Sequence, residues 1–224
     1  MFIVECYRNN IGVLHMNSSV LFIVIALICA YLIGSFPSAY LMARFRKGID
    51  IRVVGSKSMG AMNVFYKVGF AEGMLVLAVD IGKGAAAVAL ARWLGVPMIV
   101  ELFAGVAAII GHSFPVWLKF HGGRGGATTI GILVFLMPWG IPFYLAIFGL
   151  SLLITRYPTL SYSLAFLCFP FIAWLIYHSG ALVVFSVCIL LLPIIKYIPR
   201  IKEMRSSGGN WRHVILRKSF KDRL

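Results

Sequence analysis

The fold class is decided by residues 71–118, AEGMLVLAVDIGKGAAAVALARWLGVPMIVELFAGVAAIIGHSFPVWL. Two apolar runs, about 71–94 and 98–118, flank a turn at RWLGVP. Each run is about as long as the roughly 20 residues that a helix needs to cross a bilayer. A spanning segment must satisfy its own backbone hydrogen bonds, so both runs are expected to be transmembrane helices.

The composition extends this interpretation to the whole chain. Of the 224 residues, 61% are hydrophobic, whereas soluble domains have about 45–50% apolar residues. Further apolar runs begin at Val20 and cover about 127–155, 160–178 and 180–197. Pro138 and Pro142 interrupt 127–155, so we expect two segments there, one of them short or broken. The sequence predicts an all-α polytopic membrane protein with about seven transmembrane helices.

The charge distribution predicts the orientation. Lys and Arg number 21 against 7 Asp and Glu, and cytoplasmic loops of membrane proteins accumulate Lys and Arg. An N-out/C-in arrangement places loop 44–69, loop 119–126 and the basic tail 198–224 on the cytoplasmic face. The excess charge has two interpretations, topology alone or an anionic partner such as lipid head groups or a phosphate-bearing substrate.

Three regions are expected. Residues 1–18 form an N-terminal extension in which Met16 is a possible true start, residues 19–197 form the membrane domain, and 198–224 form a cytoplasmic tail. The spacing of the four cysteines resembles no metal site. The high apolar content argues against nucleic-acid binding.

The loop KFHGGRGG, residues 119–126, is the first candidate site. Glycines let backbone N–H groups surround an anion, and a guanidinium matches phosphate oxygens. The following helix would direct the positive end of its dipole to the same place. The candidate phosphate-binding residues here are Lys119, Gly122, Gly123, Arg124, Gly125 and Thr128. The alternative is a flexible turn with a topology-setting arginine.

The loop GSKSMGAMN, residues 55–63, has a similar character, although it could also be an ordinary interfacial turn. It contributes Gly55, Ser56 and Asn63. On the same face as loop 119–126, and together with Arg52 and Lys67, it could hold a substrate that carries more than one negative charge.

Asp80, Lys83 and His112 are further candidates, which lie inside apolar runs. Asp80 and Lys83 share a helix face at spacing i, i+3, which favours a self-neutralising packing pair, with Lys83 reaching the anion site as the alternative. His112 is the best candidate base because its pKa lies near physiological pH, although a lone histidine is more often a packing residue.

In this order, GSFPSAYLMARFRKGIDIRVVGSKSMGAMNV, DIGKG and IGHSFPVWLKFHGGRGGATTIG resemble the bacterial acyl-phosphate:glycerol-3-phosphate acyltransferases over about 34–131. The resemblance implies a multi-pass protein of the bacterial cytoplasmic (inner) membrane whose active face is cytoplasmic. It would transfer a fatty acyl group from acyl phosphate to the 1-hydroxyl of glycerol 3-phosphate, giving lysophosphatidic acid in phospholipid biosynthesis. Its partners would be these two substrates and membrane lipid, with no cofactor and no metal.

The resemblance also implies site residues, with Ser56 and His112 as catalytic candidates. The family's Gly-Ser pair matches Gly55 and Ser56, its asparagine matches Asn63, and its Lys-Gly-Gly-Lys-Gly pattern matches HGGRG at 121–125.

The chain departs from the family pattern at Met62, at Tyr66 in place of arginine, and in KYIPRIKEM at 196–204 in place of a His-Arg-Glu-Asn-Ile-like run. Two alternatives therefore accompany the prediction. One is a non-catalytic member that binds anionic lipid or a partner, and the other is an acyltransferase with a different phosphorylated acceptor.

Overall fold

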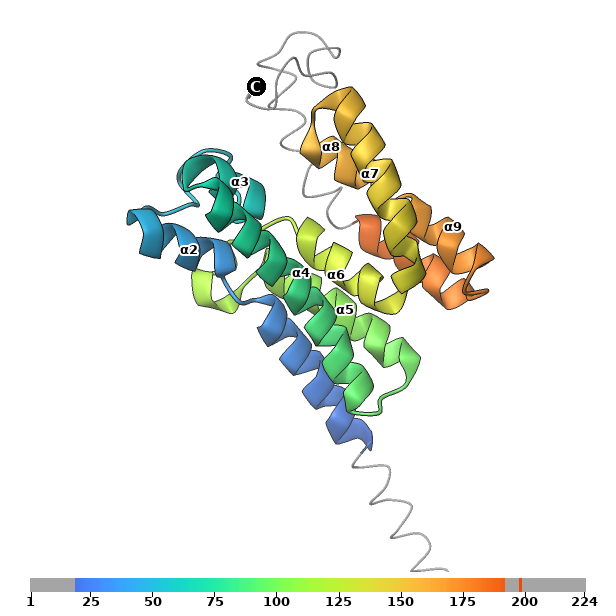
Figure 1. Ribbon diagram of the computed structural model, residues 1–224. Coiled ribbons are helices and arrows are strands. Elements are labelled where there is room, and N and C mark those ends of the chain that lie inside the picture. The colour runs from blue at the N-terminus through green and yellow to red at the C-terminus, as the bar shows by residue number, and fades with distance from the viewer. Residues whose placement is uncertain (1–18, 192–197, 199–224) are drawn as a thin grey trace, which may run out of the picture.

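The computed structural model describes residues 19–191 and residue 198, and all regular elements in these residues are helical (Figure 1). The all-α prediction is therefore confirmed for this part of the chain. After an opening helix over 19–34, the elements are α2 (Ser38–Lys47), α3 (Ala61–Lys67), α4 (Phe70–Trp93), α5 (Met98–Ser113), η1 (Val116–Leu118), α6 (Gly126–Leu136), η2 (Pro138–Gly140), α7 (Ile141–Thr155), α8 (Pro158–Ala165), α9 (Cys168–Leu175) and a helix at Gly180–Leu191.

Four helical stretches are long and apolar enough to cross a membrane, and three shorter apolar helices accompany them. The long stretches are Ser19–Lys47, Phe70–Trp93, Met98–Leu118 and Pro138–Thr155, and the short helices are Gly126–Leu136, Leu160–Leu175 and Gly180–Leu191. Large apolar side chains such as Trp93, Leu153 and Phe171 face outward, as expected where lipid replaces water around a protein. Seven crossings and the N-out orientation stay predictions.

Prolines divide the apolar runs into separate helices. The break predicted in 127–155 is confirmed, because α6 ends at Leu136 and Pro138 begins the 3-10 turn that precedes α7. The break at 35–37 in the first run was not predicted. Pro37 lacks the N–H that a continuing helix requires, so the chain turns there and α2 begins at Ser38.

Glycines allow the central helices to approach one another closely. A Cβ on Gly84 of α4 would collide with the carbonyl oxygen of Thr128 in α6, and one on Gly131 of α6 would collide with that of Ile81 in α4. Small residues at such crossings maximise van der Waals contact between membrane helices. In Figure 1, α6 accordingly crosses α4 near the middle of the molecule.

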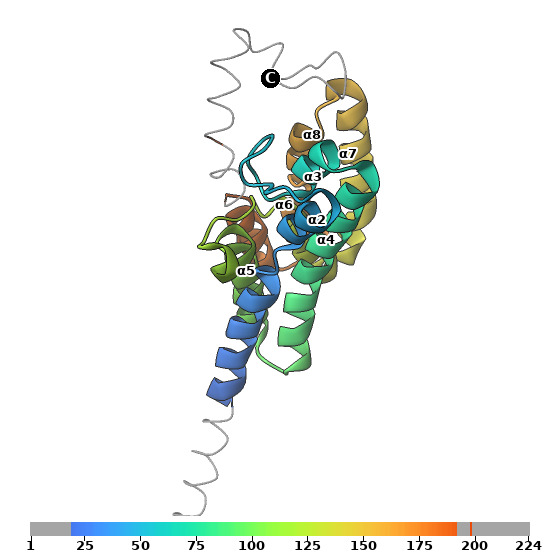
Figure 2. The same cartoon turned by 90° about the vertical axis from the view of Figure 1, so that its left-hand side faces the viewer.

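The segment between the first and second long stretches is a folded unit. Figure 2 shows α2, α3 and the loop that joins them grouped together in the upper half of the molecule. Ile51, Met59 and Val64 are buried in a small apolar cluster with residues of α2 and α4. The loop at 44–69 is therefore structured. The predicted extension 1–18 and the tail 198–224, apart from Ile198, lie outside the described residues.

Candidate active site

Asn63 holds the first glycine-containing loop together. Its side chain is 3% exposed, and its Nδ2 donates to the carbonyl oxygens of Ile51 at 3.1 Å, Val54 at 3.0 Å and Ser58 at 3.0 Å. Its Oδ1 accepts the backbone N–H of Ser56 at 3.2 Å. One amide therefore joins four backbone groups of the loop, which is how a polar residue becomes compatible with burial.

Gly55, which precedes Ser56, lies against the side chains of Asn63 and Lys67. Its φ is +61°, and a Cβ there would collide with Asn63 Oδ1 and lie 2.9 Å from Lys67 Cε. Only glycine fits such a left-handed position with side chains so close. The loop thus brings together four of the predicted site residues, Gly55, Ser56, Asn63 and Lys67. The side chain of Lys67 is exposed.

Arg52 is engaged within its own loop. Its Nη2 lies 2.7 Å from Asp50 Oδ2, its Nε lies 3.0 Å from Asp50 Oδ1, and its guanidinium lies 5.0 Å from the ring centroid of Tyr40. The hydrogen bonds and charge of Arg52 lower the pKa of Asp50 to about 2. Arg52 would have to share its guanidinium in order to bind a substrate anion as well.

The second glycine loop packs directly on the end of α5. The N–H of Gly123 donates to the carbonyl oxygen of His112 at 3.0 Å. A Cβ on Gly123 would collide with His112 Nε2, and one on Gly122 would collide with the His112 carbonyl oxygen. Gly125 has a φ of +82°, and a Cβ there would lie 2.9 Å from Ile109 Cγ2. These glycines are therefore required for close packing, whatever else the loop does.

The other predicted members of this loop differ in exposure. Arg124 is half-buried, just before the first turn of α6, and Lys119 is exposed. No side chain caps the first turn of α6, so the backbone N–H groups of this turn face the loop without a side-chain acceptor. Thr128 is 0% exposed, and its hydroxyl has no hydrogen-bond partner among the described residues. The structure does not bring Thr128 to an accessible surface.

A buried polar cluster includes His112, on which the second loop packs. Asp80 is 1% exposed, and its Oδ1 lies 2.8 Å from Lys83 Nζ, as expected for the predicted pair. The same oxygen accepts the Ser38 hydroxyl at 2.7 Å and lies 3.8 Å from His112 Nδ1. Lys83 Nζ also donates to the carbonyl oxygen of Phe36 at 3.1 Å, at the break in the first helix. The cluster therefore joins α2, α4 and α5.

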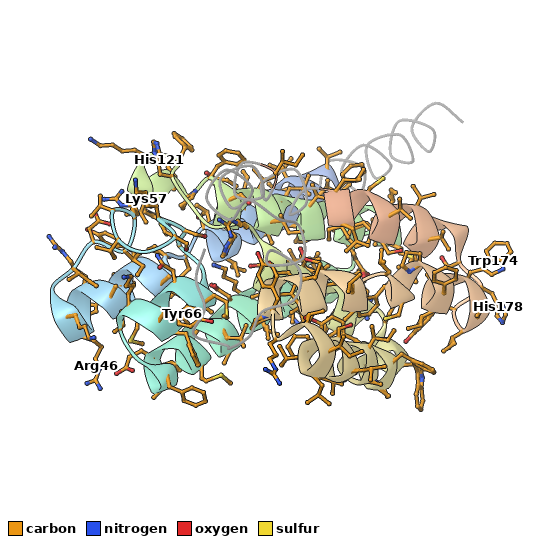
Figure 3. The ribbon with its side chains drawn as sticks, turned by 90° about the horizontal axis from the view of Figure 1, so that it is seen from above. Arg46, Lys57, Tyr66, His121, Trp174 and His178 are labelled. Atoms are coloured by element: carbon orange, nitrogen blue, oxygen red, sulfur yellow. The ribbon has the colours of Figure 1, made fainter. Side chains whose placement is uncertain are left out.

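A small pocket adjoins this cluster at the break in the first helix. Its lining residues are Ser35, Phe36, Pro37, Ser38, Ala39, Met59, Lys83, His112 and Pro115. Met59 comes from the first loop, while His112 and Pro115 lead into the second. Figure 3 shows Lys57 of the first loop and His121 of the second on the same side of the molecule, far from Trp174 and His178.

Sequence reasoning missed Ser35, Ser38 and Met59 as members of the site. A signal for the serines was present, because Ser-Phe-Pro-Ser interrupts an apolar run that is otherwise uniform. Met59 carries no such signal, since nothing in its chemistry distinguishes it from a core residue. Lys196 and Arg200, which take the place of the family's third motif, lie outside the described residues.

These features define a multi-pass helical membrane protein with two glycine-containing loops that carry cationic side chains. The family model described as glycerol-3-phosphate acyltransferase matches residues 24–207. The chain belongs to the glycerol-3-phosphate acyltransferase family.

Individual relatives agree with this assignment. Glycerol-3-phosphate acyltransferase 2 of Dehalococcoides mccartyi (strain ATCC BAA-2266 / KCTC 15142 / 195) is 56% identical over 209 residues, which cover 92% of this chain and 100% of the relative. The glycerol-3-phosphate acyltransferase of Endomicrobium trichonymphae is 35% identical, over 87% of this chain and 98% of the relative.

The fold also matches a solved structure. The crystal structure of PlsY, an integral membrane glycerol 3-phosphate acyltransferase, in its glycerol 3-phosphate form has a TM-score of 0.76 and 29% identity, over 84% of this chain and 92% of that one. The lysophosphatidic acid form has a TM-score of 0.73.

Proposed function

We propose that this protein transfers a fatty acyl group from acyl phosphate to the 1-hydroxyl of glycerol 3-phosphate, giving lysophosphatidic acid and inorganic phosphate. The observation that carries the proposal is the packing of the second glycine loop on His112, which lines one pocket together with Met59 of the first loop, in a chain of this family. Both substrates bear phosphate, so a site that provides cations and backbone N–H groups from two loops suits the pair.

The chemistry requires little beyond positioning. The hydroxyl oxygen attacks the acyl carbon, the bond from that carbon to the phosphate oxygen breaks, and phosphate leaves with the bonding electrons. Phosphate is a good leaving group and departs already charged, so no general acid is needed. Holding two substrates in the reactive geometry can supply several kcal/mol of the barrier, and cations can stabilise the charge that develops.

Arg124, the glycines of its loop and the N-terminus of α6 are the groups that we assign to phosphate. Lys67 and Lys119 are exposed and add positive charge from the two loops. Ser56 is assigned to the acceptor or to the reacting carbonyl oxygen. The hydroxyl proton passes to a base. His112 is the candidate in the chain, and a substrate phosphate oxygen is the candidate outside it.

The orientation in the membrane follows from the Lys and Arg residues of the two loops. With the N-terminus outside, both loops lie at the cytoplasmic surface of the bacterial inner membrane, where water-soluble glycerol 3-phosphate would arrive. The acyl tail of the donor would lie between helices and face the bilayer. The outward-facing apolar side chains of the bundle support this placement.

The proposal is tested with purified full-length protein, acyl phosphate and radiolabelled glycerol 3-phosphate. We expect labelled lysophosphatidic acid that requires both substrates. Parallel reactions with other phosphorylated alcohols determine the acceptor. If glycerol 3-phosphate gives no product while another phosphorylated alcohol does, the assigned acceptor is wrong. If no acceptor gives product, the protein is not an acyltransferase of this type.

A further inference from the structure

We propose that Asp80 is a positioning residue for this reaction, which acts through His112 on the glycine loop at 121–126. Paired with Lys83, it would hold the His112 ring as a support beneath Gly123. The inference rests on the proposed acyltransfer function. It assigns the buried charges of α4 a role beyond helix packing, and it makes His112 a support for the loop that holds phosphate.

The first link joins Asp80 to three parts of the chain. Its Oδ1 is shared by Lys83 Nζ at 2.8 Å and the Ser38 hydroxyl at 2.7 Å, and lies 3.8 Å from His112 Nδ1. Lys83 extends the contact to the Phe36 carbonyl at 3.1 Å. The carboxylate therefore lies where α2, α4 and α5 meet, in contact with Ser38 and Lys83, which line the pocket.

The second link joins His112 to the loop. The His112 backbone accepts the N–H of Gly123, and its ring meets Gly123 so closely that a Cβ there would collide with Nε2. One ring nitrogen thus faces Asp80 and the other faces the loop. Such an arrangement transmits the position of the carboxylate to the loop through a rigid ring.

Burial argues against His112 as the base. The residue is 6% exposed, and its Nε2 is covered by Gly123. A base must come within hydrogen-bond distance of the proton that it removes, and a substrate hydroxyl cannot reach Nε2 here without displacement of the loop. A substrate phosphate oxygen needs no such movement, so we assign the proton to that oxygen.

A second ion pair provides a matched control. Arg92 and Glu101 join the same two helices at their other end, beside the turn at 94–97, with an Nη2 to Oε2 distance of 2.9 Å. Glu101 is buried, like Asp80. Loss of this pair affects the packing of α4 and α5 without touching the pocket, so it separates a general effect of helix packing from a positioning effect.

The experiment uses two double variants. One combines Asp80→Asn with Lys83→Gln, so that no buried charge is left unpaired. The control combines Glu101→Gln with Arg92→Gln. Kinetics are measured with purified full-length protein for both substrates. We expect the Asp80/Lys83 double variant to raise KM for glycerol 3-phosphate about tenfold with kcat within about threefold, since loop position governs substrate binding. The acceptor has no acyl chain to anchor it, so its binding depends most on phosphate contacts.

His112→Asn completes the test, because its amide nitrogen takes the place of Nδ1 but does not titrate. As a support, it should act mainly on KM. As a base, its loss should lower kcat by about 10²–10⁴-fold, which would overturn the positioning role of His112. KM values within twofold of wild type in the Asp80/Lys83 variant, or equal KM changes in the control, would overturn the role of Asp80.

Two further outcomes are informative. If the double variant does not fold, a Gly123→Ala chain combined with His112→Ala replaces it. We expect the combination to be less impaired than Gly123→Ala alone, because the smaller side chain makes room for the added Cβ; an additive loss would contradict the coupling. A wild-type protein without turnover would instead overturn the proposed function itself.

Discussion

The backbone N–H of Ser56 donates to the side-chain oxygen of Asn63 at 3.2 Å, across seven residues of the first loop. The nitrogen of the same amide bonds three carbonyl oxygens of that loop. The position of Ser56 thus depends on one buried side chain. Asn63 organises the site without needing to touch a substrate.

Asn63→Asp should therefore lower activity although the two side chains have the same shape. A carboxylate offers no donor, so three carbonyl oxygens, one in a buried bond and two in partly buried bonds, lose their partner and face a negative charge. We expect about 2–3 kcal/mol of lost stability in the loop and a reduction of kcat/KM of at least about tenfold, with helix content unchanged. Limited proteolysis and kinetics measure the two effects.

Val53→Ala is the control for this variant, because Val53 lies in the same loop and is 69% exposed. It should behave as wild type in both measurements. An Asn63→Asp protein with wild-type kinetics and proteolysis would show that the amide does not organise the loop.

Two glycines of α4 should respond in opposite ways to the same change. Gly84→Ala would drive a Cβ into the Thr128 carbonyl, whereas a Cβ on Gly82 meets nothing within 4 Å. We expect Gly84→Ala to separate α4 from α6 and cost about 1–3 kcal/mol. Gly82→Ala should be neutral or stabilise by about 0.5–1 kcal/mol, because alanine favours a helix. Thermal unfolding in detergent compares them, and equal midpoints would contradict the packing described for α4 and α6.

The ion pair of Asp50 and Arg52 gives a pH dependence. The pKa of Asp50 is lowered from 3.8 to about 2 by Arg52, so the pair stabilises the folded loop fully above about pH 4. That contribution is lost as the pH falls toward 2. We expect Asp50→Asn to be less stable than wild type at pH 7 by about 1 kcal/mol or less, because solvent screens the pair.

Unfolding midpoints of wild type and Asp50→Asn should accordingly converge as the pH is lowered from 4 to 2. A constant difference over this range would show that Asp50 contributes through something other than its charge.

The helices were largely predictable from the sequence because bilayer length and proline positions leave few alternatives. Pro138 correctly divided one apolar run into two helices. Pro37 also breaks a run, but this break was not predicted from hydropathy because apolar residues lie on both sides of it. The break matters because it turns Ser38 and the Phe36 carbonyl toward the charges of α4.

The site was predictable by residue type and less so by role. The glycines at 122, 123 and 125 were expected to admit an anion, yet the structure also gives each a packing contact that excludes a side chain. Arg52 and Thr128 matched the chemistry of a phosphate site, but one is paired with Asp50 and the other is buried against α4. Long-range packing decides such roles, and the spacing of residues along one chain does not contain it.

The central claim is that the second glycine loop binds substrate phosphate through Arg124. The direct measurement is steady-state kinetics of Arg124→Ala, with Arg46→Gln as the control because Arg46 is exposed and paired with Glu72 away from the pocket. We predict that Arg124→Ala lowers kcat/KM for glycerol 3-phosphate or acyl phosphate by about 10- to 150-fold, since hydrogen bonds to charged groups contribute roughly 1.5–3 kcal/mol. Its unfolding midpoint should stay near that of wild type. Unchanged kinetics in a folded Arg124→Ala protein would remove the loop from the active site.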